Sequence, residues 1–177
     1  MLNFFVILFV TAVKRVNKLS YNLIDVAESL ANKLSLSNSR IDDNEISILL
    51  CGSNADYTLS VVLRPDDMIL FACDLDIKAS KKRYNAVTNA IVKVNERIWV
   101  GHFDLHSAGN DIIFTLAIPF ISSFIADEFL LESAIKLILT ECEKYYHYFS
   151  MVASAYELSK TTITSVEALF LDTAGEA

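Results

Sequence analysis

Glycine and proline are scarce in this chain, with four glycines and two prolines among 177 residues. Disordered chains, and repetitive all-β architectures with many tight turns, use these residues more freely. Hydrophobic residues make up 53% of the sequence and charged residues 21%, and neither an internal repeat nor a low-complexity linker interrupts it. We therefore expect a single domain with one well-packed core.

Basic residues are also in deficit, with 15 Lys and Arg against 22 Asp and Glu and a formal net charge of −7. The chain has no long Lys/Arg cluster, and nucleic-acid binding depends on neutralising phosphates, so a nucleic-acid partner is excluded. A Gly-rich phosphate loop, a Walker motif and a G-x-S-x-G elbow are all missing. The sequence therefore predicts neither an enzyme nor a cofactor.

Cysteine is infrequent as well, and its three residues have no C-x-x-C spacing. This excludes a zinc ribbon and a thioredoxin-like redox motif. Cys51 and Cys73 lie in apolar runs and Cys142 lies on a predicted helix. We expect buried, reduced thiols, which fit a reducing cytoplasm.

The apolar run at residues 2–13 is shorter than the roughly 17–25 residues that cross a bilayer as a helix. Lys14, Arg15 and Lys18 follow this run instead of preceding it, and no small-residue cleavage site comes after, so it does not resemble a signal peptide. Residues 1–18 are predicted to be a packed first helix, a weak membrane anchor or an extension without a folded role. The positive charges favour a cytoplasmic main domain in each case.

Apolar residues recur at helical spacing in 22–34, in 81–100 and from about 127 to beyond 149. Alternating apolar residues predict strands at 46–50, 57–63, 102–106 and 112–118, and the continuous apolar run 68–73 predicts an interior strand covered on both faces. A further helix is expected to start at Thr164, because Glu167 completes a capping box. The order α-β-β-β-α-β-β-α predicts a single α+β domain, with a mainly antiparallel sheet of about five strands covered by helices.

Three sequence blocks resemble the YbjN-like family of bacterial proteins. Residues 95–105 read Asn-Glu-Arg-Ile-Trp-Val-Gly-His-Phe-Asp-Leu, similar to the family signature N-E-x-[LI]-W-x-G-H-F-[DE]-L. Residues 141–146 are similar to its E-C-E-R-F-Y block, and residues 167–177 to its E-A-L…E-T-x-G-E-A close. The resemblance covers about residues 19–177, which we take as the domain.

The resemblance implies a fold like that of type III secretion chaperones and a non-enzymatic role, regulator-like or chaperone-like. It supplies no catalytic residues. The chain departs from the family between residues 149 and 166, where the usual Trp-Gly-Gly-Lys stretch is missing, and at His106, where the family often has tryptophan. These departures leave any role of that stretch open.

His102, Asp104 and His106 alternate along a predicted strand, so their side chains should share one face. Imidazole and carboxylate groups can hold Zn²⁺ or Fe²⁺, and a metal-dependent hydrolase is therefore an alternative function. The simpler interpretation is a solvent-facing strand with Phe103 in the core. Likewise, Glu96 and Glu141 could divide acid and base roles or be ordinary surface charges.

The sole tryptophan, Trp99, is predicted to anchor the core at the end of a helix that Gly101 terminates in a left-handed conformation. Aromatic residues at 145–149 surround the last long helix, so part of them should form a patch for a protein partner or a second copy of the chain. The partner is unknown, and a homodimer is one option. The predicted interaction or signature residues are Trp99, Gly101, His102, Phe103, Asp104, Glu141 and Tyr145.

Overall fold

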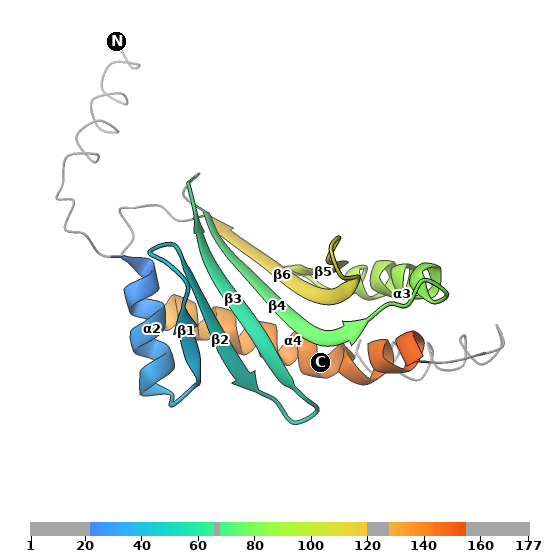
Figure 1. Cartoon of the computed structure of the whole chain (residues 1–177), viewed down its shortest axis with the longest axis horizontal. Helices are drawn as coiled ribbons and strands as arrows, with labels where there is room; N and C mark the ends of the chain where they lie inside the picture. The colour runs from blue at the N-terminus through green and yellow to red at the C-terminus, as the bar shows by residue number, and fades with distance from the viewer. Residues whose placement is uncertain (1–21, 66–67, 120–127, 155–177) are drawn as a thin grey trace, which may run out of the picture.

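Six antiparallel strands form one open sheet in the spatial order β1-β2-β3-β4-β6-β5 (Figure 1). The computed structural model describes residues 22–65, 68–119 and 128–154. The predicted α+β class and element order are confirmed, and a sixth strand, β1, adds to the five expected. The elements are α2 (Leu23–Lys33), β1 (Asn38–Arg40), β2 (Glu45–Cys51), β3 (Asp56–Arg64), β4 (Met68–Lys78), α3 (Tyr84–Asn95), β5 (His102–Leu105), β6 (Asp111–Pro119) and α4 (Glu128–Ser154).

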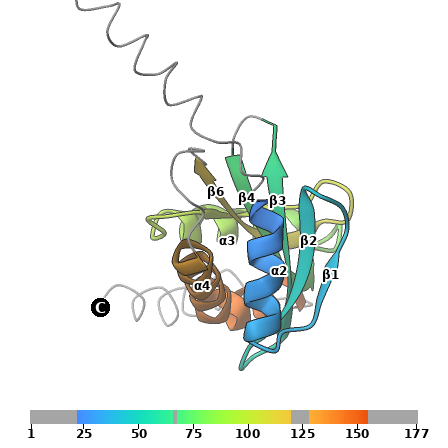
Figure 2. The same ribbon diagram turned by 90° about the vertical axis from the view of Figure 1, so that its left-hand side faces the viewer.

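The helices cover one face of the sheet. Figure 2 shows α2 and α4 on the same side of the strands, and α3 packs against both α4 and β5. Burial alternates along β4, where Phe71 and Cys73 are buried beneath the helices while Leu70 and Ala72 on the opposite face are only half-buried. The prediction that this strand is covered on both faces is therefore wrong. Its apolar run supplies the core on one side and an open sheet surface on the other.

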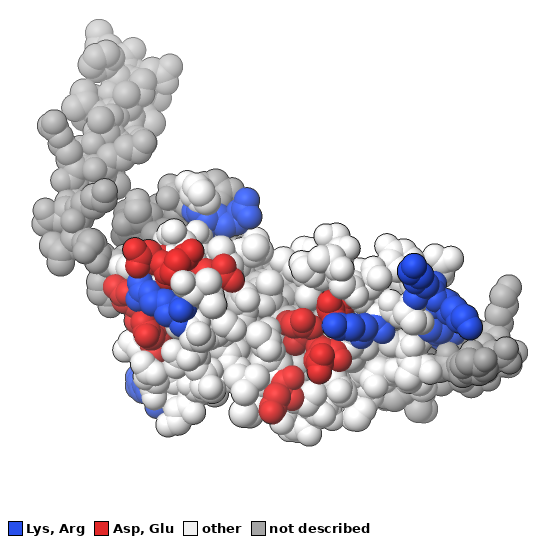
Figure 3. Space-filling model, in the orientation of Figure 1, with Lys and Arg blue, Asp and Glu red and all other residues white. Residues whose placement is uncertain are grey.

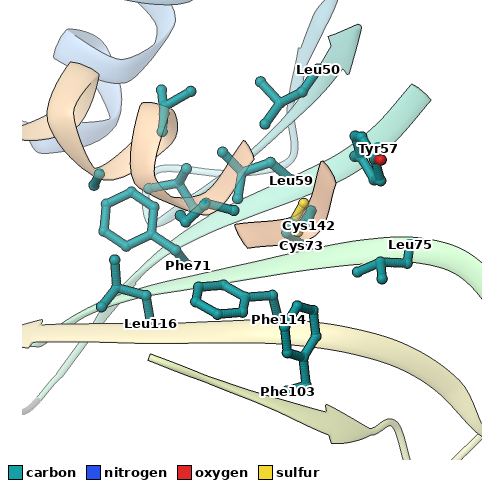
Figure 4. Close-up of a cluster of buried hydrophobic side chains, with 14 of the residues drawn as sticks. Leu50, Tyr57, Leu59, Phe71, Cys73, Leu75, Phe103, Phe114, Leu116 and Cys142 are labelled. Atoms are coloured by element: carbon teal, nitrogen blue, oxygen red, sulfur yellow. The ribbon is translucent and has the colours of Figure 1, made fainter. Parts of the chain in front are cut away.

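The core lies between the sheet and α4 and is rich in aromatic rings (Figure 4). The Phe103 ring meets those of Phe114 and Phe149 at centroid distances of 5.0 and 4.8 Å, both edge to face, an arrangement that aromatic pairs favour. Cys73 of β4 and Cys142 of α4 lie together in this core and are free thiols, as predicted. Cys51 is also free but exposed at the end of β2, so its predicted burial is wrong.

Helix α2 and strand β1 stabilise each other at one edge of the sheet. The Asn22 side chain caps α2 by accepting a hydrogen bond from the Ile24 amide at 2.9 Å. Arg40 of β1 reaches back to α2 and pairs with Asp25 at 2.6 Å and Glu28 at 3.2 Å. These ionic contacts tie an otherwise polar edge strand to the helix layer.

Helix α3 is shorter than the 81–100 span predicted, since it ends at Asn95. The chain then turns through residues 96–101 before entering β5. The expected helix at Thr164 and the apolar run 2–13 lie outside the described residues. Within the part of the chain that is described, no helix is long and apolar enough to cross a membrane.

Candidate interaction surface

The turn between α3 and β5, which we call the α3–β5 corner (residues 95–103), is held by the side chain of Asn95. Its Nδ2 donates to the Phe103 carbonyl at 2.9 Å, and its Oδ1 accepts from the Phe103 amide at 2.8 Å. The amide side chain thus pairs with the backbone of edge strand β5 as a neighbouring strand would. This double hydrogen bond fixes where the helix ends and where the strand begins.

Gly101 holds the other side of the corner. Its φ of 81° lies in the left-handed region that favours glycine. A Cβ atom here would lie 2.5 Å from Cζ of Phe114 and 2.9 Å from the Thr115 carbonyl oxygen. The predicted left-handed conformation is confirmed, although the residue closes the turn several residues after the helix end. Only glycine fits this close approach without a shift of its neighbours.

Phe103 joins the corner to the core. Its ring also packs edge to face on Tyr145 of α4, at a centroid distance of 5.8 Å. Tyr145 is 1% exposed, and its hydroxyl has no hydrogen-bond partner among the described residues. These two signature residues therefore act as packing residues that support the corner.

Trp99 lies fully in solvent at this rigid corner, with 98% of its surface exposed. The prediction that it anchors the core is wrong, because the helix that was expected to carry it inward ends four residues earlier. Ile98 packs against the core in its place. An exposed tryptophan is unusual in a monomeric surface and common at binding sites.

Further apolar side chains are exposed on α3 and in the turn. Tyr84 is 44%, Val92 55% and Val100 49% exposed. Tyr84 and Val92 are eight residues apart, which places them on one flank of the helix. We call this flank, together with Trp99 and Val100, the α3 stripe.

The α3 stripe is bordered by positive charge in a protein whose net charge is negative. Residues 79–101 contain five Lys or Arg and one Glu. Lys81, Lys82 and Arg97 are exposed, and no ion pair joins any of them to another described residue. Figure 3 shows Lys and Arg, and no Asp or Glu, at the right-hand end, where Figure 1 places the start of α3. The surface therefore offers apolar contact next to unpaired cations.

The candidate metal residues are not brought together. His102 and Asp104 pair with Thr115 and Ile113 on β6 and so share the face of the sheet that the helices leave open. The strand ends at Leu105, and His106 lies in the turn that follows. In residues 22–65, 68–119 and 128–154, no group of three or more His, Cys, Asp or Glu side chains could hold a metal ion.

Glu141 and its neighbour Glu143 have different environments on α4. One carboxylate oxygen of Glu141 is buried and has no hydrogen-bond partner among the described residues. Glu143 instead accepts hydrogen bonds from the hydroxyl of Tyr57 at 2.6 Å and from the side-chain amide of Asn54 at 3.0 Å. A side chain at Gly52 would collide with it. Glu143 therefore clamps the turn between β2 and β3 to α4.

Tyr57 of this clamp is fully buried. Burial, and then the hydrogen bond to Glu143, raise the pKa of Tyr57 above its ordinary value. Its hydroxyl therefore stays protonated and able to donate. The clamp is not visible in the sequence, because Glu143 is 86 residues from Tyr57 and no local spacing predicts such a contact.

Comparison with known proteins gives one family match. A sequence model named YbjN, described as "Putative bacterial sensory transduction regulator", matches residues 24–151, and a search of curated proteins finds no match. The chain is similar to the solved structure of YbjN, "a putative transcription regulator from E. coli", with 9% identity and a TM-score of 0.49 over 71% of this chain and 92% of that chain. It is also similar to a chain of the ExsC–ExsE complex, with 10% identity and a TM-score of 0.44 over 80% of this chain and 100% of that chain.

Proposed function

Because the chain belongs to the YbjN family, we propose that it is a non-enzymatic protein-interaction module, regulator-like or chaperone-like, that works in the cytoplasm. The family description names a regulator of sensory transduction. The α3 stripe would be its docking surface. A protein partner would bind there through apolar contacts around Trp99.

The observation that carries this proposal is the 98% exposure of Trp99 on a rigid support. Tryptophan is among the residues that contribute most to binding when a partner removes it from water. Asn95, Gly101 and Phe103 already fix the backbone on which it stands. A partner would then lose little free energy in ordering the turn.

Replacing Trp99 with alanine tests the proposal. Partners captured from a lysate by the tagged wild-type protein are identified by mass spectrometry, and their affinity for Trp99→Ala is then measured. Loss of a central anchor costs about 2 kcal/mol or more, a roughly 30-fold weaker affinity. Circular dichroism should show that Trp99→Ala remains folded, because the side chain is exposed and its removal leaves no cavity in the core.

Phe129→Ala is the matched control, since Phe129 is also aromatic and 73% exposed but lies at the start of α4. It should keep the partner. Equal affinity of wild type and Trp99→Ala for every captured partner would contradict the proposal. Light scattering after size exclusion shows whether a second copy of the chain is the partner, because Trp99→Ala should then shift a dimer to monomer.

A membrane-tethered adaptor is the second candidate, favoured by the apolar run 2–13 and the cations Lys14, Arg15 and Lys18 behind it. Cell fractionation of the chain with and without residues 2–13 tests it. Recovery of both forms in the soluble fraction would reject tethering.

A further inference from the structure

We propose that the C-terminal segment of this chain, residues 155–177, docks on the α3 stripe and covers Trp99 until a protein partner displaces it. The inference rests on the proposed function, because it concerns the regulation of the same surface. Three features of the molecule support it: the place where α4 ends, the length of the segment and the match of charge and apolar residues.

Helix α4 delivers the segment to the beginning of α3. The guanidinium Nε of Arg83, the residue before α3, donates to the carbonyl of Val152 at 2.9 Å. Val152 is two residues from Ser154, the last residue of α4. The end of α4 therefore lies next to the start of α3, which is one end of the α3 stripe.

The segment is long enough to reach Trp99. Helix α3 has 12 residues, which corresponds to a length of about 18 Å. Residues 155–177 would span about 35 Å even if they were helical throughout, and more if they were extended. The segment can therefore follow the whole α3 stripe and return.

The segment also has the complementary chemistry. It contains four acidic residues, Glu157, Glu167, Asp172 and Glu176, against one lysine, whereas residues 79–101 have five basic residues and one acidic residue. Its sequence also contains the apolar residues Leu169, Phe170 and Leu171, which could contact the apolar side chains of the α3 stripe. The N-terminal segment carries Lys14, Arg15 and Lys18, and like charges make it a poor match for this surface.

Trp99 is the only tryptophan, so its fluorescence reports on this site alone. We would measure acrylamide quenching in the full-length protein. If the docked form outweighs the open form about tenfold, the quenching slope should be about tenfold lower than that of a free tryptophan amide. Leu169→Asp/Phe170→Asp, which removes the apolar contact, and Lys81→Glu/Lys82→Glu, which reverses the charge, should each restore the high slope.

Lys33→Glu/Lys136→Glu is the matched control, because it makes the same change of net charge at exposed lysines of α2 and α4. It should keep Trp99 protected. A synthetic peptide of residues 155–177, added to the Leu169→Asp/Phe170→Asp protein, should protect Trp99 again. With an effective concentration of about 1 mM for the tethered segment, tenfold docking corresponds to a peptide Kd of about 0.1 mM, and added salt should weaken it.

A quenching slope for the wild type equal to that of the free amide would overturn the inference. Protection of Trp99 that persists in both double variants would also overturn it. Protection that disappears on dilution would overturn it as well, because a second copy of the chain, and not residues 155–177 of the same chain, would then cover Trp99. Circular dichroism checks that each variant is folded. These measurements contain no partner, so a negative quenching result rejects the docking of residues 155–177 without rejecting the proposed function. Conversely, a negative result with Trp99→Ala in the partner assay rejects the proposed function without changing the quenching result.

Discussion

Replacing Gly101 with alanine tests whether the α3–β5 corner is built as a rigid support. The residue has a φ of 81°, and left-handed backbone costs an L-residue about 1–2 kcal/mol. The new methyl group would lie 2.5 Å from Cζ of Phe114, and relieving such overpacking typically costs about 1–3 kcal/mol. We expect the free energy of unfolding to fall by about 2–5 kcal/mol in total.

Urea denaturation followed by circular dichroism measures this loss. Since small domains are stable by about 5–15 kcal/mol, Gly101→Ala should remain folded but clearly weakened. Each kcal/mol lowers Tm by about 2–4 °C in a chain of this size, so a decrease of at least about 4 °C is expected. The partner affinity of the folded fraction should fall as well if the corner positions Trp99.

Gly109→Ala is the matched control. Gly109 lies in the turn between β5 and β6 and its φ is not positive. A Cβ atom there would meet only the end of the Asp111 side chain, which would have to rotate and loosen its ion pair with Lys78. It should lower the free energy of unfolding by no more than about 1 kcal/mol, the usual contribution of a surface ion pair. If Gly101→Ala is no less stable than Gly109→Ala, the close contact with Phe114 does not hold the corner.

Further predictions concern Tyr57, Tyr145 and the three cysteines. Tyr57→Phe removes the hydrogen bond to the Glu143 carboxylate and should lower the free energy of unfolding by about 1.5–3 kcal/mol. Tyr145→Phe removes a buried hydroxyl that has no hydrogen-bond partner among the described residues. It should leave the free energy of unfolding unchanged or raise it, as urea denaturation would show. Stability should also depend on pH through Tyr57, whose pKa is higher in the folded state than in the unfolded chain. The stability that the protonated Tyr57 hydroxyl contributes is complete below pH 10 and falls as the pH rises above it. Tyr57→Phe should flatten this loss by up to about 1.4 kcal/mol per pH unit. A thiol reagent should modify Cys51 in the native protein, and the two buried cysteines only after denaturation.

The fold was largely predictable because apolar alternation marked the strands that line the core. Ile46, Ile48 and Leu50 point inward as expected, and the same alternation places Cys51 outward. Strand β1 was missed because its three residues are polar, and its position depends on Arg40 contacting α2. Periodicity describes burial along one element and says nothing of such contacts between elements.

The candidate site was only partly predictable, and Trp99 shows why. Ile98 and Trp99 extend the apolar spacing of α3, so the pattern predicted a longer helix with a buried tryptophan. The helix ends earlier because the Asn95 side chain bonds to the backbone of Phe103. That competing interaction requires β5 to be in place, and local propensity does not contain it. The alternation of His102, Asp104 and His106 does not place the three side chains on one face either, because β5 ends at Leu105 and His106 lies in the turn that follows.

The position of α4 at the end of the described chain has a consequence for synthesis on the ribosome. The meander from β1 to β4 is complete at Lys78, but the helix that covers Phe71 and Cys73 ends at Ser154. At about 5–20 residues per second, the ribosome needs roughly 4–15 s to make the intervening 76 residues. During that interval the apolar face of the nascent sheet has no α4 to cover it. Release of a truncated chain before residue 128 would therefore give a species prone to aggregation and to capture by the cell's general chaperones.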